Sequence, residues 1–68
     1  MENYYTVEVV LIRYTIVAPN EYIAAEQATL KFLNDVPHYQ FSTVTAIVNG
    51  KKIDVHVEKT FKVSASVV

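Results

Sequence analysis

Hydrophobic and polar residues alternate on both sides of the dipeptide Asn49-Gly50. Period-two alternation is typical of strands with one buried face. Asn and Gly both accept the positive φ of a two-residue type I′ turn, so residues 44–57 are predicted to form a β-hairpin with one apolar and one largely polar face. The turn also sets the register. The predicted pairs are Val48 with Lys51, Ile47 with Lys52, Ala46 with Ile53, Thr45 with Asp54, Val44 with Val55 and Thr43 with His56.

Residues 4–17 are rich in Tyr, Val, Ile and Thr and predict one long strand. The alternation changes phase near Val10 and Leu11, because the apolar residues are mainly odd-numbered before this point and even-numbered after it. A β-bulge would produce such a change. The alternative is a central strand that is covered on both faces. We favour the bulge.

A helix is predicted from Asn20, the expected N-cap, to about Asn34. Glu21 lies near the positive end of the helix dipole, and Pro37 prevents the helix from continuing. At 100° per residue, one stripe of side chains forms the predicted core face. It consists of Tyr22, Ala25, Ala28, Thr29, Phe32 and Leu33.

The alternation of the hairpin continues almost to the end of the chain, with apolar residues at odd positions up to Val67. The preceding hairpin strand begins near residue 40 and is too short to pair with all of this segment. Residues 60–68 must therefore pair with the N-terminal strand, pair with another protomer or fray. We predict a C-terminal strand or tail that is used in oligomerisation.

These elements predict a single α+β domain over residues 1–68, with the order β-α-β-β. One helix would cover one face of a three-stranded, mainly antiparallel sheet of strand order 2-3-1. A domain this small often needs disulfides, a metal or oligomerisation, and the chain has no cysteine. Apolar residues left outside the predicted core are therefore interpreted as interaction residues. They are Ile23, Leu30, Ile47, Phe61, Val63 and Val67.

The composition is that of a folded domain, since 51% of the residues are hydrophobic and only one is glycine. No apolar run is long enough to cross a membrane, and no basic segment of the kind found in a signal peptide precedes the first apolar run, so a cytoplasmic location without membrane contact is expected. The formal net charge of −1 provides no strong field for nucleic acid.

Three potential metal ligands, Asp54, His56 and Glu58, share one face of the second hairpin strand. A closed site would need further ligands, so this cluster is interpreted as a solvated strand face. No glycine-rich loop and no nucleophile elbow is present, so we predict no catalytic residue, no metal site and no cofactor. A nucleic-acid-binding module is the alternative function. Its contacts would be Lys51, Lys52, Lys59 and Lys62.

The five tyrosines suit protein–protein contacts, because tyrosine supplies a large amphipathic surface. In its size and lack of motifs, the chain resembles in type the small accessory proteins of bacteriophages and mobile elements. That resemblance implies a role in binding macromolecules by surface contact. The sequence thus predicts a small, non-enzymatic, oligomeric interaction or regulatory protein that binds itself and another protein.

Overall fold

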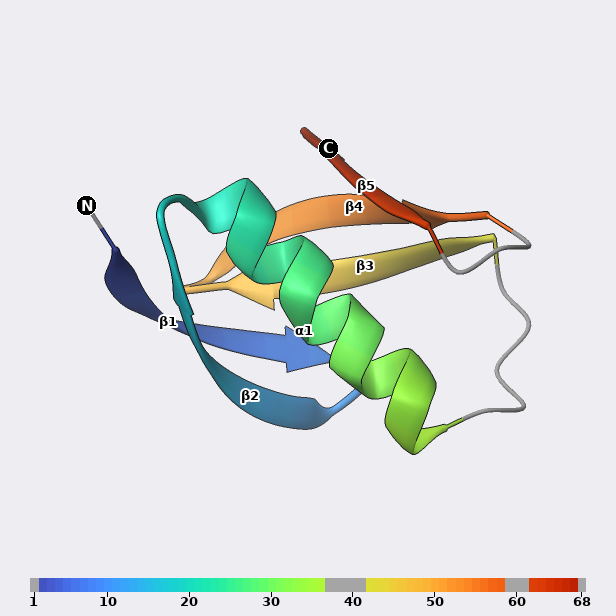
Figure 1. The fold of residues 1–68 in the computed structure, drawn as a ribbon, viewed down its shortest axis with the longest axis horizontal. Helices are drawn as coiled ribbons and strands as arrows, with labels where there is room; N and C mark the ends of the chain where they lie inside the picture. The colour runs from blue at the N-terminus through green and yellow to red at the C-terminus, as the bar shows by residue number, and fades with distance from the viewer. Residues whose placement is uncertain (1, 37–41, 59–61, 68) are drawn as a thin grey trace.

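A five-stranded antiparallel sheet with one helix across one face forms the molecule (Figure 1). The computed structural model describes residues 2–36, 42–58 and 62–67. The strand order in the sheet is β2-β1-β3-β4-β5, so β2 and β5 are the two edge strands. The elements are β1 (Asn3–Val9), β2 (Ile12–Ala18), α1 (Glu21–Asp35), β3 (Thr43–Val48), β4 (Lys51–Val57) and β5 (Val63–Val67).

The β3–β4 hairpin confirms the predicted turn and all six predicted pairs. Asn49 has φ 48° and Gly50 has φ 87°, as a type I′ turn requires. Asn49 also joins this hairpin to β1, because its backbone N–H donates to the Thr6 carbonyl and its Oδ1 accepts from the Thr6 N–H, both at 3.0 Å. The turn therefore stabilises the contact between β1 and β3 as well as its own hairpin.

Helix α1 begins as predicted, with the Oδ1 atom of Asn20 accepting from the Ile23 N–H at 2.9 Å. It ends at Asp35, close to the predicted Asn34. The buried helix residues match the predicted stripe, except that Ala24 joins it and Tyr22 is only partly buried. Three buried alanines allow the backbone of the helix to lie close to the sheet. The buried Thr29 hydroxyl donates to the Ala25 carbonyl at 2.8 Å, so its polar atom is satisfied inside the core.

The prediction of one long strand with a bulge was wrong, because residues 4–17 form most of the β1–β2 hairpin. The two strands pair from Asn3 with Ala18 to Val9 with Ile12, and Val10 and Leu11 form the turn. A two-residue turn explains the change of phase, because it pairs odd-numbered residues of β1 with even-numbered residues of β2, as in Val7 with Tyr14, and paired residues share a face. The sequence hid this turn because Val and Leu lack the usual turn chemistry.

The predicted three-stranded sheet of order 2-3-1 was also wrong. Strand β1 pairs with β3 and not with the second hairpin strand, β4. Residues 63–67 pair with β4 of the same chain, on the side of β4 that faces away from β3. The C-terminal alternation thus forms β5, which extends the sheet within the chain itself. This intrachain pairing was not predicted, because the order 2-3-1 placed the N-terminal strand on that side of β4.

The core lies between α1 and one face of the sheet. Alternate residues of each strand point into it, including Val7, Ile16, Ala46 and Ile53. No helix of the described residues covers the opposite face of the sheet, which is largely polar. The side chains described on it are Tyr4, Thr6, Glu8, Arg13, Thr15, Val17, Thr43, Thr45, Ile47, Lys52, Asp54, His56, Ser64 and Ser66.

Candidate interaction surface

Exposed apolar side chains gather on the β1–β2 hairpin. Leu11 is 88% exposed and Tyr4 is 77% exposed. Of the six large hydrophobic residues that are exposed in the described part of the chain, five belong to this hairpin and the sixth is Leu30 on α1. We call the five the hairpin surface. They are Tyr4, Val10, Leu11, Ile12 and Val17.

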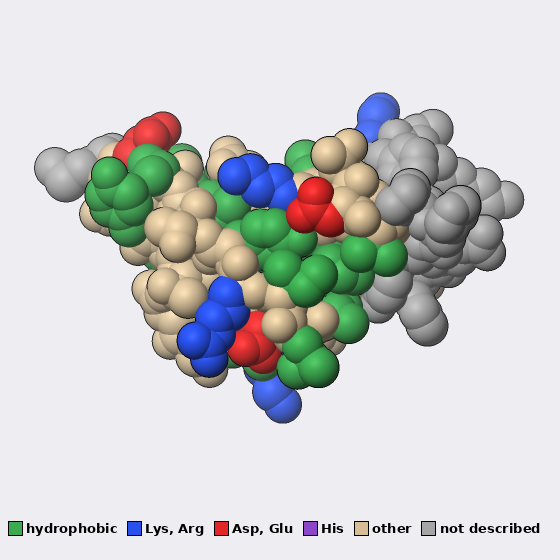
Figure 2. Space-filling model, turned by 90° about the horizontal axis from the view of Figure 1, so that it is seen from below, with side chains coloured by type: hydrophobic (Ala, Val, Ile, Leu, Met, Phe, Trp, Pro, Cys, Tyr) green, Lys and Arg blue, Asp and Glu red, His purple; other side chains and the backbone are tan. Residues whose placement is uncertain are grey.

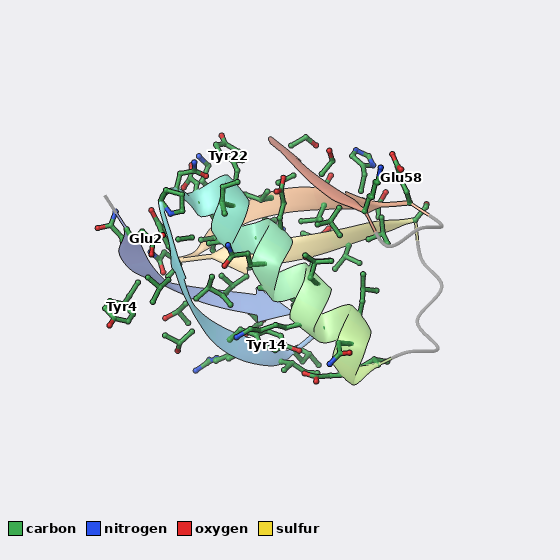
Figure 3. All side chains as sticks on the ribbon, in the orientation of Figure 1. Glu2, Tyr4, Tyr14, Tyr22 and Glu58 are labelled. Carbon is green, nitrogen blue, oxygen red and sulfur yellow. The ribbon has the colours of Figure 1, made fainter. Side chains whose placement is uncertain are left out.

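Two views show how side chains lie on this side of the molecule. Seen from the side on which β2 lies in Figure 1, the molecule presents hydrophobic side chains in its middle with charged side chains above and below them (Figure 2). Tyr4 projects away from the body of the molecule beside β1, whereas Tyr14 lies under the C-terminal half of α1 (Figure 3). Large apolar areas on a polar surface are typical of interaction sites.

The turn of this hairpin has a strained backbone. Val10 has φ 47° and Leu11 has φ 68°, in the left-handed region that β-branched and bulky residues rarely adopt. The Asn49-Gly50 turn has nearly the same φ values, 48° and 87°, with residues that accept them. One chain therefore contains the same kind of turn twice, once with suitable residues and once with two exposed hydrophobic ones.

Tyr14 of β2 contacts the C-terminal end of α1, where its hydroxyl donates to Asp35 Oδ2 at 3.1 Å. Desolvation by burial, the hydrogen bond to Asp35 and the charge of Asp35 all raise the pKa of Tyr14 above its ordinary value of 10.0. At the N-terminal end of α1, Lys51 Nζ lies 2.7 Å from Glu21 Oε1 and 5.7 Å from the centre of the Tyr22 ring. The hydrogen bond and charge of Glu21 raise the pKa of Lys51.

Both raised pKa values predict a loss of stability at alkaline pH. A group whose pKa is higher in the folded state stabilises the fold fully below its unfolded pKa and loses this effect as the pH rises through its folded value. We expect the free energy of unfolding to fall above about pH 10, from the ordinary values of 10.0 for Tyr14 and 10.5 for Lys51. Urea unfolding of wild type and Tyr14→Phe at pH 8 and pH 11 checks this. A decline of the same size in both proteins would contradict the role given to Tyr14.

The predicted interaction residues do not form one surface. Ile23 and Val63 are partly buried against the core, and Leu30 is 43% exposed on α1. Ile47 is half-buried on the open face of the sheet, between Glu8 of β1 and Lys52 of β4. Val67 of β5 pairs with Ile53 of β4, and Phe61 lies outside the described residues. The sequence missed the hairpin surface because residues 4–17 were interpreted as one continuous strand.

The other candidates are dispersed or locally bonded. Lys51 points to the helix side of the sheet, whereas Lys52 lies on the open face, so the two do not form one basic patch. Lys62 is exposed, and Lys59 lies outside the described residues. Asp54 Oδ1 accepts from the Thr45 hydroxyl at 3.0 Å, and His56 Nδ1 lies 3.4 Å from the Thr43 hydroxyl. Within residues 2–36, 42–58 and 62–67, no three His, Cys, Asp or Glu side chains are placed to hold a metal ion.

The chain matches no protein-family model, no curated protein and no solved structure at a significant level. Among the residues that the structure describes, no helix has the length and apolar character needed to cross a membrane. The fold defines a small α+β protein.

Proposed function

We propose that the protein is a small, non-enzymatic interaction protein that works as an oligomer and makes its contacts through the hairpin surface. Five exposed hydrophobic residues on one edge hairpin support this proposal. They form two groups on this hairpin, because Tyr4 and Val17 pair on the open face at one end, whereas Val10, Leu11 and Ile12 lie at the turn at the other end. Covering them with a polypeptide partner would remove apolar area from water, which is the main favourable term in protein association.

The turn at Val10 and Leu11 is the observation that carries the proposal. A left-handed backbone costs roughly 1–2 kcal/mol for each residue with a side chain. Both side chains are exposed, at 48% and 88%, so burial within the monomer offsets little of this cost. Strained, exposed hydrophobic residues that persist in a fold are typical of positions kept for binding. We infer that Val10 and Leu11 are retained for contact with a partner.

Replacing the turn by Asn-Gly separates binding from folding. The double variant Val10→Asn, Leu11→Gly is expected to raise the free energy of unfolding by about 1–2 kcal/mol, because the strain falls while the added glycine offsets part of the gain. The same variant is expected to weaken self-association, measured by sedimentation velocity over a range of concentrations. The exposed helix residue Leu30 offers a matched control, since Leu30→Gln removes apolar area outside the hairpin.

Two results would overturn the proposal. A less stable Asn-Gly variant would mean that Val10 and Leu11 stabilise the fold. Their presence would then not indicate a binding role. Unchanged self-association in this variant, or an equal loss in Leu30→Gln, would mean that the hairpin surface is not the contact surface.

A further inference from the structure

Within residues 2–36, 42–58 and 62–67, the outer edge of β2 has backbone groups without a hydrogen-bond partner, and the ladder shows which residues carry them. Thr6 and Thr15 are opposite each other in the β1–β2 ladder. The N–H and the carbonyl of Thr6 both bond to Asn49, on the side away from β2. In an antiparallel ladder, opposed residues exchange both of their hydrogen bonds or neither. The N–H and carbonyl of Thr15 therefore point outward from the sheet, and alternation gives Arg13 and Val17 the same orientation.

The opposite edge of the sheet is blocked. Glu58 donates from its N–H to the Lys62 carbonyl at 2.9 Å, so alternation points the backbone groups of Ala65 away from β4. There the Ala65 N–H donates to Glu26 Oε2 of α1, also at 2.9 Å. A side chain of the helix thus occupies the middle of the β5 edge. Natural proteins cover sheet edges in this way to prevent pairing, and β2 has no such cover among the described residues.

We infer that the partner of the hairpin surface is a second copy of this chain, whose β2 pairs antiparallel with the β2 described here. This inference rests on the proposed function and names its partner. The two-fold axis passes through the midpoint of Ile12–Ala18, which is Thr15. Only this register pairs β2 along its whole length with itself, so Thr15 faces the partner's Thr15 and Arg13 faces the partner's Val17. The two five-stranded sheets become one continuous sheet.

The side chains on the helix side of β2 suit this register. Tyr14 lies opposite the partner's Ile16, and the two-fold axis repeats that pair. Aromatic residues opposite β-branched residues are among the favourable cross-strand pairs. Ile12, which is 39% exposed in the single chain, lies opposite the partner's Ala18. The extension of the ladder by one position brings Leu11 of the strained turn beside the partner's Pro19.

The open face of β2 suits the same register. Glu8 and Arg13 are opposite each other and form an ion pair at 3.7 Å. In the dimer, the row of side chains formed by Glu8 and Arg13 continues across the interface through Val17 and Tyr4 of the partner subunit, because Tyr4 pairs with Val17. The aliphatic stem of Arg13 then lies over exposed apolar residues. The two Arg13 side chains are four positions apart along the strands, so like charges do not face each other.

Distances between single labels test the register. The chain has no cysteine, so Arg13→Cys, Thr15→Cys and Val17→Cys each carry one spin label per copy, on the exposed open face. We expect the shortest distance between copies at position 15, where the Cα atoms lie about 5.5 Å apart. Positions 13 and 17 are each displaced by four residues, or about 14 Å along the strand. Ser64→Cys on β5 is the control, with labels more than about 40 Å apart, because nine strand spacings separate them and they are also displaced along the strands.

A proline tests the backbone pairing. Thr15→Pro removes an N–H that has no partner among the described residues, and proline is tolerated at such edge positions. The dimer would lose two ladder hydrogen bonds at its axis, so we expect its dissociation constant to rise at least tenfold. Circular dichroism and urea unfolding establish that the variant folds. If it does not, Thr15→Lys places like charges opposite each other and is expected to weaken the dimer about threefold at low salt, whereas Thr6→Lys one strand away leaves it intact.

The results separate the two proposals. The shortest distance at position 15, with equal longer distances at 13 and 17 and a weakened Thr15 variant, supports the β2 dimer. A dimer in which the Ser64 labels are closest, or in which position 15 is not the minimum, overturns this inference and leaves the proposed function standing. Wild type that stays monomeric at every concentration overturns both.

Discussion

Phe32→Ala is expected to remove about 3–5 kcal/mol from the free energy of unfolding, the largest loss among the substitutions considered. Phe32 is 2% exposed and is the largest buried side chain of α1, whose other buried residues include three alanines. Small residues elsewhere on this face cannot expand to fill the cavity. A domain of 68 residues has a total stability of roughly 3–10 kcal/mol. Circular dichroism and urea titration should show a strongly destabilised variant.

Leu30→Ala is the matched control for this prediction. It lies two residues earlier on the same helix and is 43% exposed, so truncation leaves no cavity in the core. Alanine also preserves helix propensity. We expect a loss below about 1 kcal/mol. Similar losses in the two variants would contradict the packing of α1 against the sheet through Phe32.

Gly50→Val is expected to cost on the order of 2–3 kcal/mol, because it forces a β-branched residue into positive φ. Gly50 has φ 87°, and a Cβ atom placed there would meet nothing within 4 Å. The cost therefore comes from the backbone and not from a steric clash with neighbours. The adjacent Asn49 holds β1 through two hydrogen bonds to Thr6, so distortion of the turn also weakens the contact between β1 and β3. Urea unfolding measures the loss.

Gly50→Asn distinguishes the backbone from the side chain. Asparagine accepts positive φ far better than valine and has room at this site. Less than half of the loss seen with valine is expected. Equal losses, or an unchanged unfolding midpoint in Gly50→Val, would contradict the assignment of the strain to φ.

The two turns explain which parts of the fold could be predicted. Asn49-Gly50 was found because its residues accept the turn geometry by themselves, and its register followed from alternation. Val10-Leu11 adopts nearly the same φ values without any such preference. Its local sequence favours a strand, and only the pairing of β1 with β2 holds it in a turn. With that turn missed, the sheet was predicted with too few strands and a wrong order.

The sequence by itself determined the class of the domain, the limits and core face of α1 and the β3–β4 hairpin, because capping, periodicity and turn preference are properties of neighbouring residues. The tertiary structure decided which strands are neighbours. It paired β5 with β4 and brought Glu26 to the Ala65 N–H, and among the described residues no strand pairs with the outer edge of β2. These contacts join residues that are distant along the chain, for example Glu26 and Ala65, which are 39 positions apart. Alternation alone shows which residues face inward but not which strand lies beside them.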